Sequence, residues 1–327
     1  MAPLRTRSPY RPIDDLPRRY RVLPHAIDLR IPDFRAMDRF FLRTYAPAVV
    51  CSETWFAEFV DRVVGAIGTE FLPICRLGDG EYLFLLGFQP PTRRHGVSYP
   101  LHAARWLISK WRPRFGLRAG GTHAKRSLYG SGRYTVSEVA AIRDVYGQAL
   151  ESIARRGIIA ADLSFCAVPF QDHYFPAFRA WLDRHGIELT LANYVPFYFV
   201  YAMLTGPSRR RLFDGKRVLV IHSATGSKQR AITNSLLGNG AAAVCWHEIT
   251  AERSLYDVIP VDRFAGEVDV CVFGAGIGKP AVLAQLEALK VPCIDAGYVM
   301  EVWADPGVSS SRIFTCPDSV RGASVAP

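Results

Sequence analysis

Short apolar runs alternate with stretches of helical patterning along most of the chain, and each pattern predicts a different element. Helices are expected over residues 52–67, 135–156, 170–185 and 227–237, and over a last stretch that ends near residue 290. The second of these helices opens with a capping-box spacing at Thr135 and Glu138. Apolar runs that stop at glycine or polar residues predict buried strands at residues 71–75, 158–160, 217–221, 242–246, 268–273 and 291–294.

Strands that alternate with helices indicate βαβ units, and therefore a mostly parallel sheet with flanking helices. The expected fold class is α/β and Rossmann-like, with ligands at the carboxyl ends of the strands. The longest uncharged run, residues 189–208, contains Pro196, polar atoms and many aromatic rings. That mixture predicts a buried strand-to-helix segment, or an aromatic surface that touches lipid, rather than a span of the bilayer.

With 327 residues, of which 49% are hydrophobic and 21% charged, the composition is that of a globular protein. We expect a basic, proline- and arginine-rich arm over residues 1–35, one large domain over 36–306 and a tail over 307–327. The N-terminus does not resemble a signal peptide, and the seven cysteines include no C-x-x-C pair. These features favour a reducing, cytoplasmic location.

The net charge of +10 comes mostly from arginine. Because arginine makes bidentate contacts with phosphate, the excess favours an anionic partner, such as a nucleotide diphosphate, an anionic membrane surface or nucleic acid. A GC-rich genome would raise the arginine content with no functional meaning. The basic arm could hold the protein at the inner face of a membrane, or it could fold back on acidic patches of its own domain.

One strand exit carries the most specific chemistry, a turn that holds Arg76, Gly78, Asp79, Gly80 and Glu81. The two glycines allow a close approach of the backbone to a ligand. One guanidinium and two carboxylates suit a metal-bridged diphosphate, in which Asp79 and Glu81 bind a hard divalent cation and Arg76 binds phosphate oxygens. The alternative is a surface turn in which Asp79 caps the next helix and Arg76 pairs with Glu81.

Two further strand exits favour phosphate. Gly274, Gly276 and Gly278 follow an apolar strand and precede a helix, so their amide groups could receive a phosphate group. Their spacing is not the dinucleotide fingerprint, and a turn that needs glycine only for packing is the alternative. The other exit places Lys228 and Arg230 near the start of a helix, again in a setting that suits phosphate.

The sequence RLGDGE at residues 76–81 resembles the R-x-G-D-G-E signature of the GT-D-type glycosyltransferases, bacterial enzymes that use nucleotide sugars. Near the C-terminus, residues 272–276 and 294–303 resemble the closing strand of that family and its I-D-x-G-H-x-x-x-E-Y run. Tyr298 stands where the family has histidine. The similarity extends over residues 55–304 and is strong at the two ends of that range.

The resemblance implies a GT-D-type fold and a D-x-E motif at Asp79 and Glu81 that is associated with Mn²⁺ (or Mg²⁺) and the donor diphosphate. Asp295 and Glu301 match acidic positions of the closing run, and they are candidates for the catalytic base by position. The implied activity is transfer of a hexose, such as glucose, from a UDP-sugar or similar nucleotide sugar to a polysaccharide, glycolipid or glycoprotein acceptor.

Two other functions compete with this hypothesis. A nicotinamide-dependent oxidoreductase would use the glycines at residues 274–278, although their spacing counts against it. A basic nucleic-acid-binding protein would explain the charge, but the chain has no recognised nucleic-acid-binding motif, so we expect no nucleic-acid partner.

Overall fold

The protein is seen here in a computed structural model. It describes residues 25–28, 43–46, 52–78, 81, 84–85, 136–161, 178, 180–251 and 253–305.

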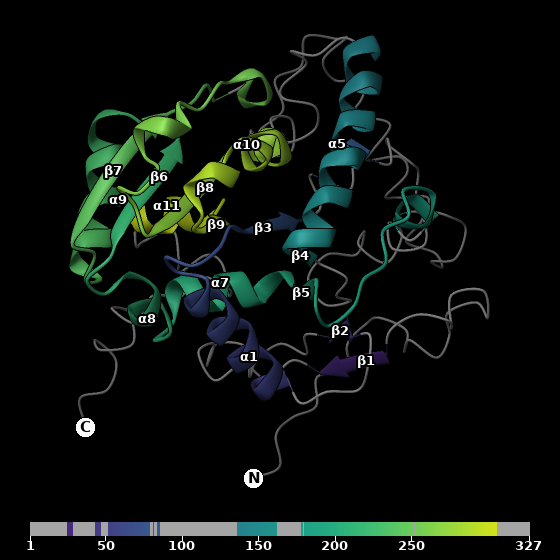
Figure 1. Cartoon of the computed structure of the whole chain (residues 1–327), viewed down its shortest axis with the longest axis horizontal. Coiled ribbons are helices and arrows are strands. Elements are labelled where there is room, and N and C mark those ends of the chain that lie inside the picture. Colours follow the sequence, from purple (N-terminus) through teal and green to yellow (C-terminus); the bar gives the residue numbers. More distant parts are fainter. Residues whose placement is uncertain are drawn as a thin grey trace, which may run out of the picture.

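A seven-stranded sheet forms the centre of the fold, and all of its neighbouring strands run parallel (Figure 1). The strand order is β5-β4-β3-β9-β8-β6-β7. The strands are β3 (Leu72–Leu77), β4 (Ile158–Ala161), β5 (Tyr194–Pro196), β6 (Arg217–His222), β7 (Ala243–Glu248), β8 (Val270–Gly274) and β9 (Pro292–Asp295). The predicted α/β class with a parallel sheet is confirmed.

Helices cover both faces of this sheet, which is why its central strands are buried along nearly their whole length. On one face, α5 (Val136–Arg156) and α10 (Lys279–Gln285) contact each other and β3. The other face carries further described helices, each of which contacts at least one of the others (Figure 1). They are α1 (Ser52–Gly65), α7 (Phe197–Thr205), α8 (Arg209–Phe213), α9 (Gly226–Gly238) and α11 (Val299–Ala304).

The uncharged run at residues 189–208 forms β5 and then α7, in which every residue after Phe197 is buried. This confirms the interpretation as a buried strand-to-helix segment. None of the helices in the described part of the chain is long and apolar enough to cross a bilayer. Of the helix predicted over residues 170–185, residues 178 and 180–184 are helical, and residues 170–177 lie outside the described ones.

The helix predicted to run to residue 290 was wrong in its length. It ends at Gln285, and a separate 3-10 turn, η8 (Glu287–Leu289), follows it. Two contacts explain the early end. The side-chain oxygen of Gln285 accepts the N–H of Ile259, and its amide nitrogen donates to the carbonyl of Asp257, which ties the helix end to the loop before β8. Lys290 then takes a left-handed φ of 54°, which no helix continues through.

Two short strands, β1 (His25–Asp28) and β2 (Arg43–Ala46), pair in an antiparallel ribbon. β1 falls within the predicted basic arm, where the sequence pattern gave no sign of a strand. The predicted tail at residues 307–327 lies outside the described residues.

The order of the strands creates two features at their carboxyl ends. The last strand, β9, lies between β3 and β8. The motif that begins at Arg76 and the run that begins at Ile294 therefore lie in neighbouring strands. In addition, the chain leaves β8 toward β9 and leaves β6 toward β7, which are opposite directions. Parallel sheets bind ligands where the connections that follow two neighbouring strands run in opposite directions.

Candidate functional site

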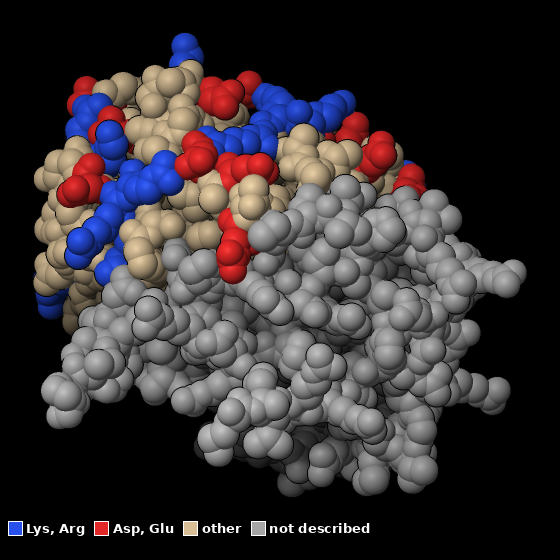
Figure 2. Space-filling view, turned by 90° about the horizontal axis from the view of Figure 1, so that it is seen from below, with Lys and Arg blue, Asp and Glu red and all other residues tan. Residues whose placement is uncertain are grey.

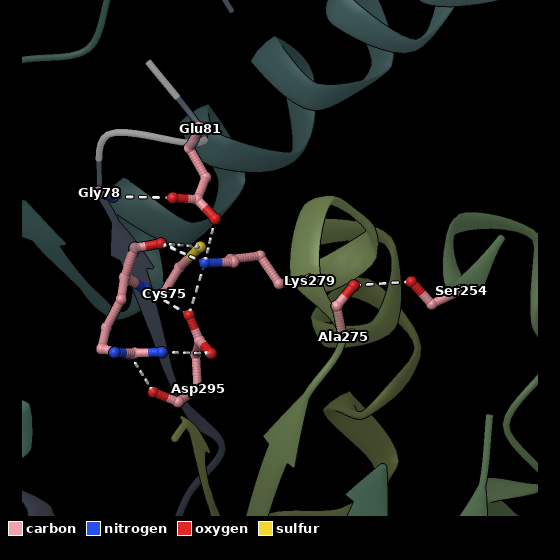
Figure 3. A network of polar contacts seen from close by, with 8 residues as sticks. Cys75, Gly78, Glu81, Ser254, Ala275, Lys279 and Asp295 are labelled. Carbon is pink, nitrogen blue, oxygen red and sulfur yellow. Dashed lines mark hydrogen bonds and ion pairs between the residues drawn. The ribbon is translucent and has the colours of Figure 1, made fainter. Parts of the chain in front are cut away.

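Four charged side chains meet at the carboxyl ends of β3 and β9 (Figure 3). Arg76 comes from the end of β3, and Glu81 from a helical segment of which residues 81, 84 and 85 are described. Lys279 is the first residue of α10, and Asp295 ends β9. The parallel register explains the meeting, because Ile74 pairs with Ile294 and the next residues of both strands continue side by side.

Arg76 binds Asp295 through three hydrogen bonds. Its backbone N–H donates to Oδ2 at 3.2 Å, its Nε to the carbonyl oxygen at 2.5 Å, and its Nη2 to Oδ1 at 3.2 Å. Both residues are almost fully buried, with 3% and 1% of their surfaces exposed. The guanidinium also lies over the rings of Phe197 (5.0 Å) and Tyr201 (4.7 Å), a cation–π arrangement. The turn alternative, in which Arg76 pairs with Glu81, was therefore wrong about the partner.

Lys279 joins the other members of this network. Its Nζ lies 2.7 Å from Glu81 Oε1 and 2.9 Å from Asp295 Oδ2, and it donates to the carbonyl of Arg76 at 2.9 Å. An ammonium group has three donors, and here each has an acceptor. The second oxygen of Glu81, Oε2, accepts the N–H of Gly78 at 2.9 Å. Two cations and two carboxylates thus form a charge-balanced cluster.

The electrostatics keep this cluster ionised. Burial alone would lower the pKa of Lys279, but Asp295 and Glu81 outweigh it and raise that pKa above its ordinary value. Burial alone would raise the pKa of Asp295, but Arg76 and Lys279 outweigh it and lower that pKa. Asp295 is therefore a weak base with both carboxylate oxygens already engaged. That is a poor starting point for the catalytic role that its position suggested.

A glycine next to the cluster is required by the close approach of Arg76. Gly297 follows β9 with a φ of +43°, and a Cβ there would overlap with Nη2 of Arg76. Any side chain at this position would push the guanidinium away from Asp295. Gly297, in the closing run of the sequence, therefore leaves the space that Arg76 of the opening motif occupies.

The three glycines after β8 have different surroundings. A Cβ on Gly274 would lie 2.7 Å from Cδ2 of His222, and one on Gly278 would overlap with Oγ of Ser254. That hydroxyl itself donates to the carbonyl of Ala275 at 2.6 Å. Packing therefore accounts for two of the glycines, as the alternative interpretation supposed. Gly276, with a φ of +51°, has open space where its Cβ would be, so a ligand could approach its backbone.

A second polar cluster lies at the carboxyl ends of β6 and β8, where the chain leaves the two strands in opposite directions. His222 ends β6, and its Nδ1 accepts the N–H of Ala224 at 2.9 Å, which leaves the proton of the neutral ring on Nε2. Burial and the nearby charge of Lys228 lower the pKa of His222 to about 4, so the ring is neutral at pH 7. Lys228 forms an ion pair of 2.5 Å with Glu301 of α11.

The predicted site residues thus fall into two groups. Arg76, Gly78, Glu81 and Asp295 meet at β3 and β9, while Gly274, Lys228 and Glu301 gather around His222; Arg230 is exposed on α9. Asp79 and Gly80 lie outside the described residues. Among the residues that the structure describes, no group of three or more His, Cys, Asp or Glu side chains could hold a metal ion.

Sequence reasoning missed two members of these clusters, Lys279 and His222. Lys279 directly follows the glycine-rich segment, so a lysine at a glycine-rich strand exit was a signal that could have been used. His222 directly follows the strand predicted at residues 217–221 and is the last residue of β6, a position from which a side chain reaches the ligand-binding edge of a parallel sheet.

No family model matches the chain, and no curated protein matches it. Two solved structures of the domain of unknown function 1792 are similar to it. One is a selenomethionine-substituted form, and the other is described as showing that this highly conserved domain has a distinct glycosyltransferase fold. Each is 11% identical to this chain over 77% of it and 86% of the other chain, with TM-scores of 0.41 and 0.42. Values this low describe a likeness of chain path and say nothing of activity.

Proposed function

We propose that the protein is a glycosyltransferase that uses a nucleotide-diphosphate sugar. One observation carries this proposal. Arg76 of the opening motif lies 219 residues before Asp295 of the closing run, yet these two residues and Glu81 share one ionic cluster at the carboxyl ends of adjacent strands. Parallel α/β sheets bind nucleotides at that edge.

The cluster itself is charge-balanced, so the positive potential for a diphosphate has to come from its surroundings. The nearest candidates are the first turn of α9, where Thr225 makes no side-chain cap, and Lys228 within that turn. Amide groups at a helix start and a lysine are a suitable setting for phosphate oxygens. The open backbone at Gly276 is a further candidate contact for the donor.

Glu301 is the better candidate for the base that activates the acceptor. It is half-buried rather than fully enclosed, and its described partner is Lys228 alone, an ion pair that a bound diphosphate could compete for. Asp295, in contrast, has every oxygen bound to Arg76 or Lys279. A general base needs an oxygen that can reach the acceptor hydroxyl.

The described residues do not fit the expected divalent metal. Of the D-x-E pair, Glu81 is the described member, and an ammonium group lies 2.7 Å from one of its oxygens while a backbone N–H binds the other. We therefore assign no step of the reaction to a metal ion.

The test is a panel of nucleotide sugars incubated with the protein without acceptor, because a transferase that binds its donor hydrolyses it slowly. Release of UDP or another nucleotide is expected for at least one sugar, with Mn²⁺ and with EDTA run in parallel. Glu301→Gln should retain UDP binding and lose transfer once an acceptor is found. Glu267→Gln, an exposed carboxylate before β8, is the matched control and should behave as the wild type.

Titration with NAD(H) under the same conditions distinguishes the oxidoreductase hypothesis from the glycosyltransferase proposal. Binding of NAD(H) in the absence of any nucleotide-sugar binding would overturn the proposal. Full transfer activity in Glu301→Gln would show that Glu301 is not the base that activates the acceptor.

A further inference from the structure

Resting on this proposed function, we infer that Lys279 is a positioning residue of the donor site. Its ammonium group takes the place at Glu81 that a divalent cation takes in a metal-binding D-x-E motif. Glu81 accordingly binds the end of β3 through Gly78 and α10 through Lys279, and it is not a metal ligand.

The contacts of Lys279 join the end of β3 to Glu81. Its Nζ donates to the carbonyl of Arg76 and pairs with the carboxylate of Glu81 (Figure 3). The third contact, to Asp295, fixes the ammonium group against β9. Because Glu81 also accepts the N–H of Gly78, it is held to β3 both directly and through Lys279.

Burial makes these contacts hard to exchange. The side chain of Lys279 is 5% exposed and that of Glu81 is 14% exposed. A buried ammonium group that lost its carboxylate would be left without compensation for its desolvation. The pKa of Lys279 is raised by Asp295 and Glu81, so the group stays charged at neutral pH rather than giving up its proton.

A divalent cation at Glu81 would meet this charge at close range. Any metal bound to Oε1 or Oε2 would lie within about 4–6 Å of the ammonium group, the range over which like charges strongly disfavour each other. In addition, Lys279 and the N–H of Gly78 each occupy one carboxylate oxygen, so a bidentate metal ion would compete with both donors for the lone pairs of Glu81.

The test combines unfolding in urea with Mn²⁺ binding followed by electron paramagnetic resonance, on the full chain. The variants are Glu81→Gln, Lys279→Met, the double variant and Lys279→Arg, with Glu267→Gln as the exposed control. Both single neutral variants should unfold at lower urea than the wild type, because each leaves the cluster with an unbalanced charge. The double variant restores the balance and should unfold at higher urea than Lys279→Met. Lys279→Arg keeps the charge and should recover part of the loss.

The Mn²⁺ affinity of Glu81→Gln should equal that of the wild type, whether that affinity is strong, weak or undetectable. A loss of Mn²⁺ affinity of about tenfold or more in Glu81→Gln, the size expected on disturbing a metal site, would overturn the inference. So would unfolding of Glu81→Gln at the wild-type urea concentration, or a double variant less stable than Lys279→Met. Failure of the wild type to bind any nucleotide would refute the proposed function instead, and the unfolding comparison would still decide the role of Lys279.

Discussion

Arg76 shows how burial changes what a charged residue does. An arginine beside two carboxylates suits a phosphate, but this guanidinium lies between Asp295 and two aromatic rings, and its Nε and Nη2 donate to Asp295. Its Nη1 is buried with no hydrogen-bond partner among the described residues. Arginine is suited to this position because a planar fork can bind a carboxylate and a carbonyl together while stacking on rings. At the residue scale, its contribution is therefore to stability and to the alignment of β3 with β9.

Arg76→Lys should lower the free energy of unfolding by about 1.5–3 kcal/mol, because a lysine keeps the charge and loses the fork that binds Asp295. Urea unfolding measures this change. Arg217→Lys is the matched control, since Arg217 also pairs with a carboxylate, that of Asp269, but at the surface, and it should change stability less. Equal stability of Arg76→Lys and the wild type would contradict the buried role.

His222 predicts a dependence of stability on pH. Its pKa is lowered to about 4 in the folded protein, while an exposed histidine has the ordinary value of 6.5. Below pH 6.5 the unfolded chain binds a proton that the folded chain does not, so stability falls as the pH drops from 6.5 to about 4. The loss is on the order of 2–3 kcal/mol.

The measurement is urea unfolding at pH 7, 5.5 and 4.5 for the wild type and for His222→Asn. The variant keeps an acceptor for the N–H of Ala224 and cannot titrate, so its stability should change less over this range. His247 also has a lowered pKa through burial, so His247→Asn is the matched variant on the neighbouring strand β7. The same slope in His222→Asn and the wild type would contradict the prediction.

At the scale of elements, the corner between α5 and β4 depends on one glycine. Gly157 follows the last residue of α5, and a Cβ there would overlap with the carbonyl oxygen of Pro73 in β3. The helix can therefore end directly against the sheet and lead into β4 without a loop. A glycine directly after a helical pattern is a stop signal, and the helix predicted to end at residue 156 does end there.

Gly157→Ala should destabilise the protein by about 1–3 kcal/mol, the usual cost of overpacking. Gly65→Ala is the matched control, because Gly65 ends α1 and a Cβ there meets nothing within 4 Å. That substitution should be neutral or should stabilise by up to about 1 kcal/mol through helix propensity. Thermal or urea unfolding of the two variants decides the point. A Gly157→Ala variant as stable as Gly65→Ala would show that β3 can move aside.

At the scale of the whole molecule, the positive charge is unevenly distributed. Among the residues that the structure describes, acidic side chains slightly outnumber basic ones, so the net charge of +10 is carried by the rest of the sequence. The described face in Figure 2 agrees, because its Lys and Arg side chains are interspersed with Asp and Glu. An electrostatic attraction to anionic surfaces would therefore depend on the other segments, including the arginine-rich residues 1–22.

Deleting residues 1–22 should reduce co-sedimentation with anionic liposomes at low salt, since each cation near such a surface contributes about 1 kcal/mol. This deletion removes six arginines and keeps β1; they are Arg5, Arg7, Arg11, Arg18, Arg19 and Arg21. Full-length protein at high salt is the control and should also sediment less, because salt screens the attraction. Equal sedimentation of both chains at low salt would mean that the arm does not bind membranes.

The sequence alone determined the α/β class, most strands of the large sheet and the strand exits that carry polar residues, because these depend on periodicity and turn residues within short windows. Only the tertiary structure decided which of these residues meet. Apolar strands attract one another without direction, so their patterns do not reveal that β9 lies beside β3, and that neighbour is what turns Asp295 and Lys279 into partners of Arg76 and Glu81. Burial then decided the chemistry, since a charge removed from water must be balanced within the fold, and the arginine and glutamate of the opening motif are bound to the protein's own charges.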